Sequence, residues 1–135
     1  MRVLLLVLLA CVTSGCYWAE RHERRAEGIR AAQEFQRTVP VCITDDECDR
    51  KWAFARRWVL DNSGYKIQHY SDDYIETFNI RDIAATRLWV RVTREPAEYD
   101  DSYRILVELG CNNPLGCNME LPEARQRFND YVNSH

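Results

Sequence analysis

The chain has 135 residues, of which 46% are hydrophobic, 29% charged and 11% aromatic, and its formal net charge at pH 7 is −3. This composition is typical of a globular protein of about one domain and excludes a disordered or low-complexity chain. A mildly acidic chain also lacks the concentrated basic field of nucleic-acid-binding proteins, so we exclude nucleic acid as a partner.

The first fifteen residues have the layout of an export signal. Met1 and Arg2 form a short positive segment, and residues 3–12 are an unbroken apolar run. This run is too short to span a bilayer, which requires roughly 20 apolar residues in a helix, but it fits the apolar core of a signal peptide, about 7–15 residues long. Residues 12–15 (Val-Thr-Ser-Gly) then lead directly to Cys16.

Residues 12–16 are similar to the lipobox of bacterial lipoproteins. The resemblance implies diacylglycerol on the Cys16 sulfur, cleavage after Gly15 and a mature chain that begins at Cys16. Cleavage removes Arg2 and no acidic residue, which takes the formal charge from −3 to −4. Acyl chains on this cysteine would anchor the protein to the membrane, because each buried methylene contributes about 0.8 kcal/mol.

Other fates of this segment stay open. Cys11 is a second candidate for lipidation, but it would leave a signal of only ten residues. An uncleaved anchor or an ordinary secretory signal is also compatible with the apolar run. In the Gram-negative pattern, Tyr17 in place of an aspartate after the cysteine implies passage to the outer membrane, with the rest of the chain in the periplasm.

Four cysteines remain once Cys11 and Cys16 are set aside: Cys42, Cys48, Cys111 and Cys117. An even number in an exported chain indicates two disulfides. Both pairs have the spacing C-x5-C, so local pairing is the simplest of three connectivities, and the sequence leaves the choice open. The close spacing of structural zinc ligands and the C-x-x-C of thiol oxidoreductases are both missing, so we predict no metal and no cofactor.

Residues 16–40 are dense in Glu, Arg, Ala and Gln and end at Pro40. Pairs such as Glu20–Arg24, four residues apart, favour a helical or half-ordered polar tether. An alternative function for the arginines at 21, 24 and 25 is contact with lipid headgroups, but the interleaved glutamates favour a solvated segment.

The domain proper is predicted to span residues 41–135 and to open with a helix over 45–61. Thr44 and Glu47 form a capping box, and apolar residues follow at helical spacing up to Val59. The segment 61–64 (Asp-Asn-Ser-Gly) is predicted to end this helix.

The apolar period then changes to two. Alternation over 65–70, 74–80, 88–93 and 103–109 predicts four strands. Pro122 suits the first turn of a last helix that runs to the end of the chain. We therefore expect a two-layer α+β domain in the order helix, four-stranded antiparallel meander, helix, with the first helix on one face.

The strand alternation also predicts a binding patch. If Leu88, Val90 and Val92 face the helix, the opposite face carries a tryptophan beside two arginines, a composition typical of interaction surfaces. The predicted patch consists of Trp89, Arg91, Arg104, Leu106 and Tyr70. The alternative is that the C-terminal helix covers this face, which would make Trp89 a core residue.

No catalytic motif accompanies these elements. His69 lies in a strand without a local acid–base partner, and the adjacent acidic pairs fall where caps and turns are expected. The block from Cys42 to Val132, with C-x5-C-x3-W opening a helix, resembles small uncharacterised lipoproteins of Gram-negative bacteria, which implies no activity. We therefore expect a non-enzymatic, lipid-anchored periplasmic domain that binds an envelope protein; the alternative is a hydrolase or inhibitor acting on cell-wall or secreted molecules.

Overall fold

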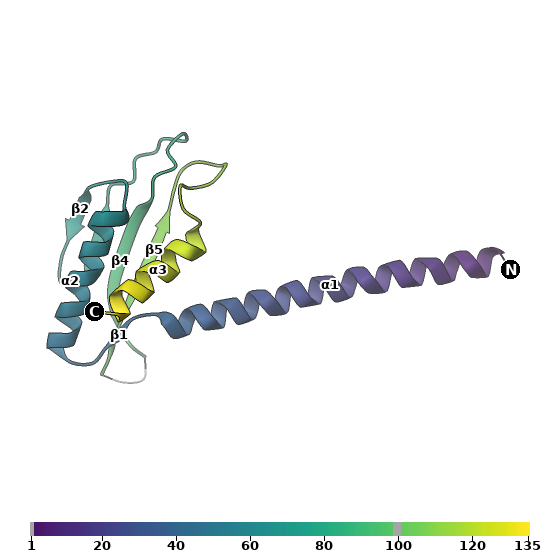
Figure 1. The fold of residues 1–135 in the computed structure, drawn as a ribbon, viewed down its shortest axis with the longest axis horizontal. Helices are drawn as coiled ribbons and strands as arrows, with labels where there is room; N and C mark the ends of the chain where they lie inside the picture. Colours follow the sequence, from purple (N-terminus) through teal and green to yellow (C-terminus); the bar gives the residue numbers. More distant parts are fainter. Residues whose placement is uncertain (1, 99–100) are drawn as a thin grey trace. The chain divides into compact units, whose positions relative to one another are not determined.

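The computed structural model describes the backbone of residues 2–98 and 101–135, and within these ranges the side chains from Glu20 onward. In chain order its elements are α1 (Arg2–Thr38), β1 (Val41–Cys42), α2 (Asp45–Asn62), β2 (Ile67–Tyr70), β3 (Tyr74–Thr77), β4 (Trp89–Pro96), β5 (Tyr103–Gly110) and α3 (Leu121–Asn133) (Figure 1). The chain divides into two compact units, Met1–Arg37 and Thr38–His135. The boundary falls three residues before the predicted start of the domain at Val41.

The first unit consists of α1, which is helical through both the apolar segment and the polar segment. Glu20 and Arg24 form an ion pair of 3.6 Å one turn apart, as do Glu34 and Arg37 at 3.6 Å, and all four side chains are exposed. Such pairs add a few tenths of a kcal/mol each to an exposed helix, about 0.2–0.5 kcal/mol. In the part of the chain that the structure describes, no helix has the length and apolar content needed to cross a bilayer.

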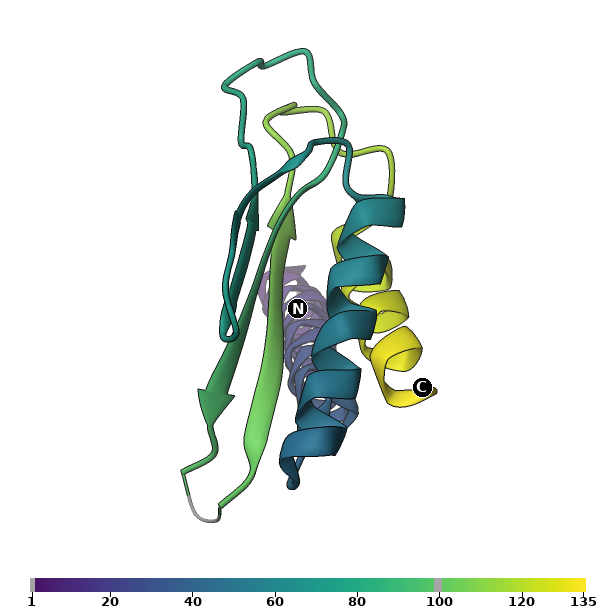
Figure 2. The ribbon, with the colours of Figure 1, turned by 90° about the vertical axis from the view of Figure 1, so that its left-hand side faces the viewer.

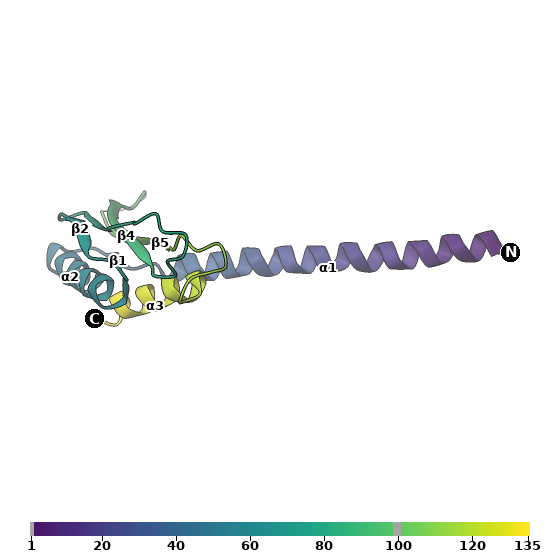
Figure 3. The same cartoon turned by 90° about the horizontal axis from the view of Figure 1, so that it is seen from above.

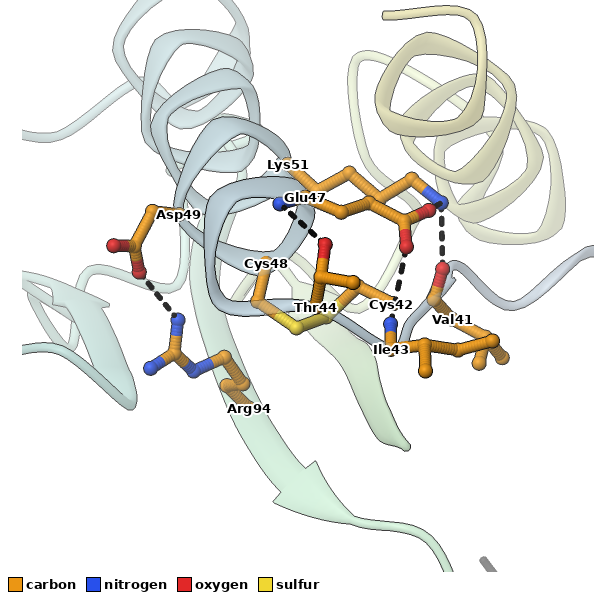
Figure 4. Close-up of a disulfide and its surroundings, with 9 residues drawn as sticks. All are labelled: Val41, Cys42, Ile43, Thr44, Glu47, Cys48, Asp49, Lys51 and Arg94. Carbon is orange, nitrogen blue, oxygen red and sulfur yellow. Dashed lines mark hydrogen bonds and ion pairs between the residues drawn. A yellow bond between two sulfur atoms is a disulfide. The ribbon is translucent and has the colours of Figure 1, made fainter. Parts of the chain in front are cut away.

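Helix α2 begins at the predicted capping box (Figure 4). The Thr44 hydroxyl accepts a hydrogen bond from the Glu47 amide at 3.3 Å, and the Glu47 carboxylate accepts one from the Ile43 amide at 3.0 Å. The carboxylate therefore reaches one residue further back than the capping residue itself. Lys51 holds Glu47 in place with an ion pair of 2.9 Å, and it also donates to the Val41 carbonyl.

The sheet is antiparallel throughout, in the order β1-β5-β4-β3-β2. Its centre is the β4–β5 ladder, in which eight residue pairs run without interruption from Trp89↔Gly110 to Pro96↔Tyr103. Strand β1 adds two residues beside the start of β5, where Val41 faces Arg104. The sheet therefore has a regular centre and two short edge strands.

Both α2 and α3 lie on the same side of the sheet and against each other, as the views in Figures 2 and 3 show. Between helices and sheet lies one apolar core, to which α2 contributes Trp58 and α3 contributes Phe128, with their rings edge to face at a centroid distance of 5.3 Å. The strands contribute the inward members of the predicted alternation: Ile75, Val90, Val92, Ile105 and Leu109. Burial of these side chains is the main stabilising term of the fold.

The expected α+β class and its helix–meander–helix order are confirmed. The strand count was wrong, since the sheet has five strands rather than four. Strand β1 has only two residues, too few to show an alternation of period two, so no pattern in the sequence predicts it.

Candidate functional site

The sheet has one face that no helix of the Thr38–His135 unit covers. We call it the open face. Side chains of alternate residues from all five strands point to it, because residues paired in register share a face. They are Val41 from β1, His69 from β2, Tyr74 and Glu76 from β3, Trp89, Arg91, Thr93 and Glu95 from β4, and Arg104, Leu106 and Glu108 from β5.

A row of charged side chains crosses the open face at right angles to the strands. Arg91 is its centre: Nη2 lies 2.9 Å from the Glu76 carboxylate, and Nη1 lies 3.2 Å from the Glu108 carboxylate. His69 extends the row, with Nδ1 3.7 Å from the other Glu76 oxygen. The register produces this row, since His69↔Glu76, Glu76↔Arg91 and Arg91↔Glu108 are successive cross-strand partners. We call these four residues the charge row.

Glu76 accepts hydrogen bonds from two neighbours on the open face. The hydrogen bond from Arg91 holds the pKa of Glu76 below its ordinary value of 4.5, and a further hydrogen bond from Tyr74 acts in the same direction. The same bond to Glu76 raises the pKa of Arg91. Glu76 therefore stays ionised at neutral pH and remains the counter-charge of Arg91.

The predicted patch residue Trp89 is half-buried, although neither α2 nor α3 covers it. Its indole lies over Gly110, its cross-strand partner, so closely that a Cβ on residue 110 would lie 2.9 Å from Cζ2 of the indole. An aromatic ring over a strand glycine shields the bare backbone and fixes the ring. The alternative that the C-terminal helix covers Trp89 is wrong, because α3 packs on the other side of the sheet. Part of the burial of Trp89 comes from its contact with Gly110 instead.

Arg104 and Leu106 also lie on the open face as predicted. Arg104 pairs in register with Glu95, and Leu106 pairs with Thr93, and both side chains are half-buried. Arg91 lies between Glu76 and Glu108, so it is committed to neighbours within the domain. The open face thus offers a partner a half-buried apolar surface of Trp89 and Leu106 beside internally paired charges.

Tyr70 does not belong to this face, which corrects the predicted patch. It pairs in register with the buried Ile75, and the Arg56 guanidinium of α2 lies 5.0 Å from the centre of its ring. The cause is a bulge between Ile67 and His69 in β2. One extra residue reverses which side chains face the helices, so His69 points outward and Tyr70 inward.

Both disulfides form with local connectivity. Cys42 and Cys48 are joined with an S–S distance of 2.04 Å, and Cys111 and Cys117 with 2.10 Å. The first links β1 to the first turn of α2, next to an ion pair of 3.1 Å between Asp49 and Arg94 (Figure 4). The second closes the loop that follows β5. The sequence had left the choice among three pairings open.

The side chain of Cys16, the predicted lipidation site, lies outside the side chains that the structure describes. Among those that it does describe, no three His, Cys, Asp or Glu residues come together in a way that could hold a metal ion.

The two glutamates of the charge row were not among the predicted patch residues. Glu76 and Glu108 each occupy an outward position of an alternating strand, which was visible in the sequence. Their meeting with Arg91 depends on the register of two hairpins, and the loops before β4 and β5 leave that register open.

Comparison of the chain with protein-family models, with curated proteins and with solved structures found no match in any of the three.

Proposed function

We propose that this protein is a lipid-anchored envelope protein whose periplasmic domain binds another envelope protein through the open face. The observation that carries the proposal is the position of α2 and α3 on one side of the sheet, which leaves Trp89 and Leu106 on a side without a helix of the domain. Tryptophan, tyrosine and arginine are enriched at protein interfaces, and Tyr74 and Arg91 lie on the same face of the sheet as Trp89.

The charge row favours a partner surface that carries charged groups over a partner surface that is entirely apolar. Both carboxylates already contact the Arg91 guanidinium, so a partner that covers the row has to balance only the one remaining negative charge. With two glutamates and one arginine the row carries a net charge of −1 when His69 is neutral. A partner with a basic rim around an apolar centre would complement it.

The proposed location rests on the N-terminal segment and the cysteines. Residues 12–16 resemble a lipobox, and two disulfides fit an oxidising compartment such as the periplasm. Replacement of Cys16 with alanine tests the anchor. We expect wild-type protein to incorporate labelled palmitate and to fractionate with the outer membrane, and the variant to do neither. Palmitate incorporation by the variant would contradict lipidation at this residue.

A pull-down of the anchored protein from detergent-solubilised envelopes tests the partner. We expect one stoichiometric envelope protein with wild type, and its loss with Leu106→Glu, which places a charge on the open face. Leu60→Glu is the matched control, because Leu60 is exposed on α2, away from that face. A background of unspecific proteins with wild type, or an unchanged partner with Leu106→Glu, would overturn the proposal.

A further inference from the structure

Two loops at one end of the sheet expose an unusual number of large apolar side chains. Residues 78–88 connect β3 to β4, and residues 111–120 connect β5 to α3. The exposed fractions are 57% for Ile80, 77% for Ile83 and 96% for Leu115, and Phe78 adds 47%. We call Ile80, Ile83 and Leu115 the apolar tip. Clustered exposed apolar groups of this kind mark interaction surfaces.

The two loops are fastened to each other. The side-chain amide of Asn112 donates to the Asn79 side chain at 2.8 Å and to the Ile80 carbonyl at 2.7 Å. Asn113 donates to the Ala84 carbonyl at 3.3 Å, and the Asn118 amide donates to the Thr86 carbonyl at 2.9 Å. Ile80 and Ile83 are therefore held beside the loop that carries Leu115.

Leu115 is presented at a closed turn. Its amide donates to the Asn113 side chain at 2.8 Å, and the Gly116 amide donates to the Asn113 carbonyl at 3.2 Å. Gly116 has φ of 123°, a conformation that glycine adopts without strain. The disulfide between Cys111 and Cys117 closes the loop around this turn. The loop therefore keeps Leu115 in solvent instead of folding it onto the core.

The charge at this end differs from that of the whole chain. Residues 78–88 contain Arg81, Arg87 and Asp82, and residues 111–120 contain one charged residue, Glu120, which gives the two loops a net charge of 0 against −3 for the chain. The Asp82 carboxylate accepts a hydrogen bond from the Ala84 amide at 2.9 Å, and Arg81 lies next to it in the chain, between Ile80 and Ile83. Apolar side chains flanked by arginines complement the acyl boundary and the phosphates of an anionic bilayer.

We propose that the apolar tip inserts into the surface of an anionic lipid bilayer. The proposal rests on the proposed function, because the lipid anchor would bring the domain to that membrane. Side chains that project from loop turns, as Leu115 does, need no matching concavity in a fluid interface, and an apolar segment sinks about 5–10 Å into it.

The reach of the tether permits this contact. The tether enters the domain at Thr38, whose carbonyl accepts a hydrogen bond from Asn133 at 2.8 Å, and β1 follows beside the start of β5. The apolar tip lies beyond the other end of β5, about 24 Å along an eight-residue strand. From Cys16 to Thr38 a helix would span about 33 Å, so an anchored domain has enough chain to bring the apolar tip to the bilayer.

Vesicle sedimentation tests the proposal, with the chain from Tyr17 to His135, which lacks only the signal and the lipidated cysteine. The probes are vesicles of phosphatidylethanolamine with phosphatidylglycerol, and vesicles of phosphatidylcholine alone. The tip variant carries Ile80→Ser, Ile83→Ser and Leu115→Ser. The matched control carries Ile29→Ser, Ile43→Ser and Leu60→Ser, which removes three apolar side chains that are also at least half exposed. Both variants keep the arginines of the tether, so any binding of vesicles through these arginines is the same in both.

We expect wild type and control to partition onto the anionic vesicles within twofold of each other, and the tip variant at least tenfold more weakly. Circular dichroism and thiol titration should show the same fold and two intact disulfides in all three proteins. Equal partitioning of tip variant and control, or no binding of wild type to anionic vesicles, would overturn the proposal. So would a photocrosslink from position 115 to a protein instead of lipid in whole cells. None of these results depends on a partner at Leu106, so the two proposals can fail separately.

Discussion

The indole of Trp89 and the backbone of Gly110 are in contact across the β4–β5 ladder, where the two residues are register partners. A Cβ on residue 110 would meet the indole at 2.9 Å from Cζ2, 3.1 Å from Cε2 and 3.2 Å from Nε1. The glycine therefore sets the position of the largest side chain on the open face. The shape of that face depends on a residue that contributes no side chain to it.

Gly110→Ala is expected to lower the free energy of unfolding by about 1 kcal/mol, because the added methyl displaces the ring in a packed sheet. Urea unfolding followed by circular dichroism measures this change. Gly28→Ala is the matched control, since a Cβ there meets nothing within 4 Å. In a Trp89→Ala background the cost of Gly110→Ala should vanish, and an unchanged cost would show that the contact between the two residues does not cause it.

Glu76→Gln is expected to reduce stability at pH 7 by up to about 1 kcal/mol, since it removes a partly exposed ion pair. The lowered pKa of Glu76 adds stability at pH values above its ordinary value of 4.5, and this contribution is lost as the pH falls through the lower folded value. The difference between wild type and variant should therefore shrink below pH 4.5 and disappear in stronger acid.

Unfolding measured at several pH values checks this dependence. In an Arg91→Gln background, Glu76→Gln should have little effect on stability, because the donor that lowers the pKa of Glu76 is gone. A difference in stability between wild type and Glu76→Gln that grows as the pH falls would contradict the lowered pKa of Glu76. An unchanged cost of Glu76→Gln in the Arg91→Gln background would contradict Arg91 as its cause.

The two disulfides are expected to contribute unequally. Each closes a loop of the same length, worth about 2 kcal/mol in the chain-entropy account. Cys42 and Cys48 are buried at the junction of β1 and α2, whereas Cys111 and Cys117 are half-buried in a loop. Cys42→Ala with Cys48→Ala should therefore lower the unfolding midpoint in urea more than Cys111→Ala with Cys117→Ala. The reverse order would contradict the packing role of the first disulfide.

The sequence predicted the elements whose signal is local. The capping box at Thr44 marks the start of α2 to the residue, and the alternation in β4 and β5 sorted Val90 and Val92 from Trp89 and Arg91. Regular periodicity over eight residues is sufficient for this because a strand places alternate side chains on opposite faces.

The open face could be predicted only in part, because its chemistry depends on long-range register. The bulge in β2 moved Tyr70 to the helix side and His69 to the open side, and no local pattern in that four-residue strand signals a bulge. The commitment of Arg91 to Glu76 and Glu108 likewise follows from pairing between strands separated by long loops. The alternation predicted which residues share a face, and the structure was needed to show which of them are paired.

Site-specific photocrosslinking in whole cells tests the central claim most directly, that the open face binds an envelope protein. Benzoylphenylalanine is placed at position 106 in one strain and at position 60 of α2 in another, each in the otherwise unchanged full-length chain. The account predicts one protein adduct of defined mass from position 106 and none from position 60. Adducts from position 60 alone, or none from position 106 in a folded and anchored protein, would contradict it.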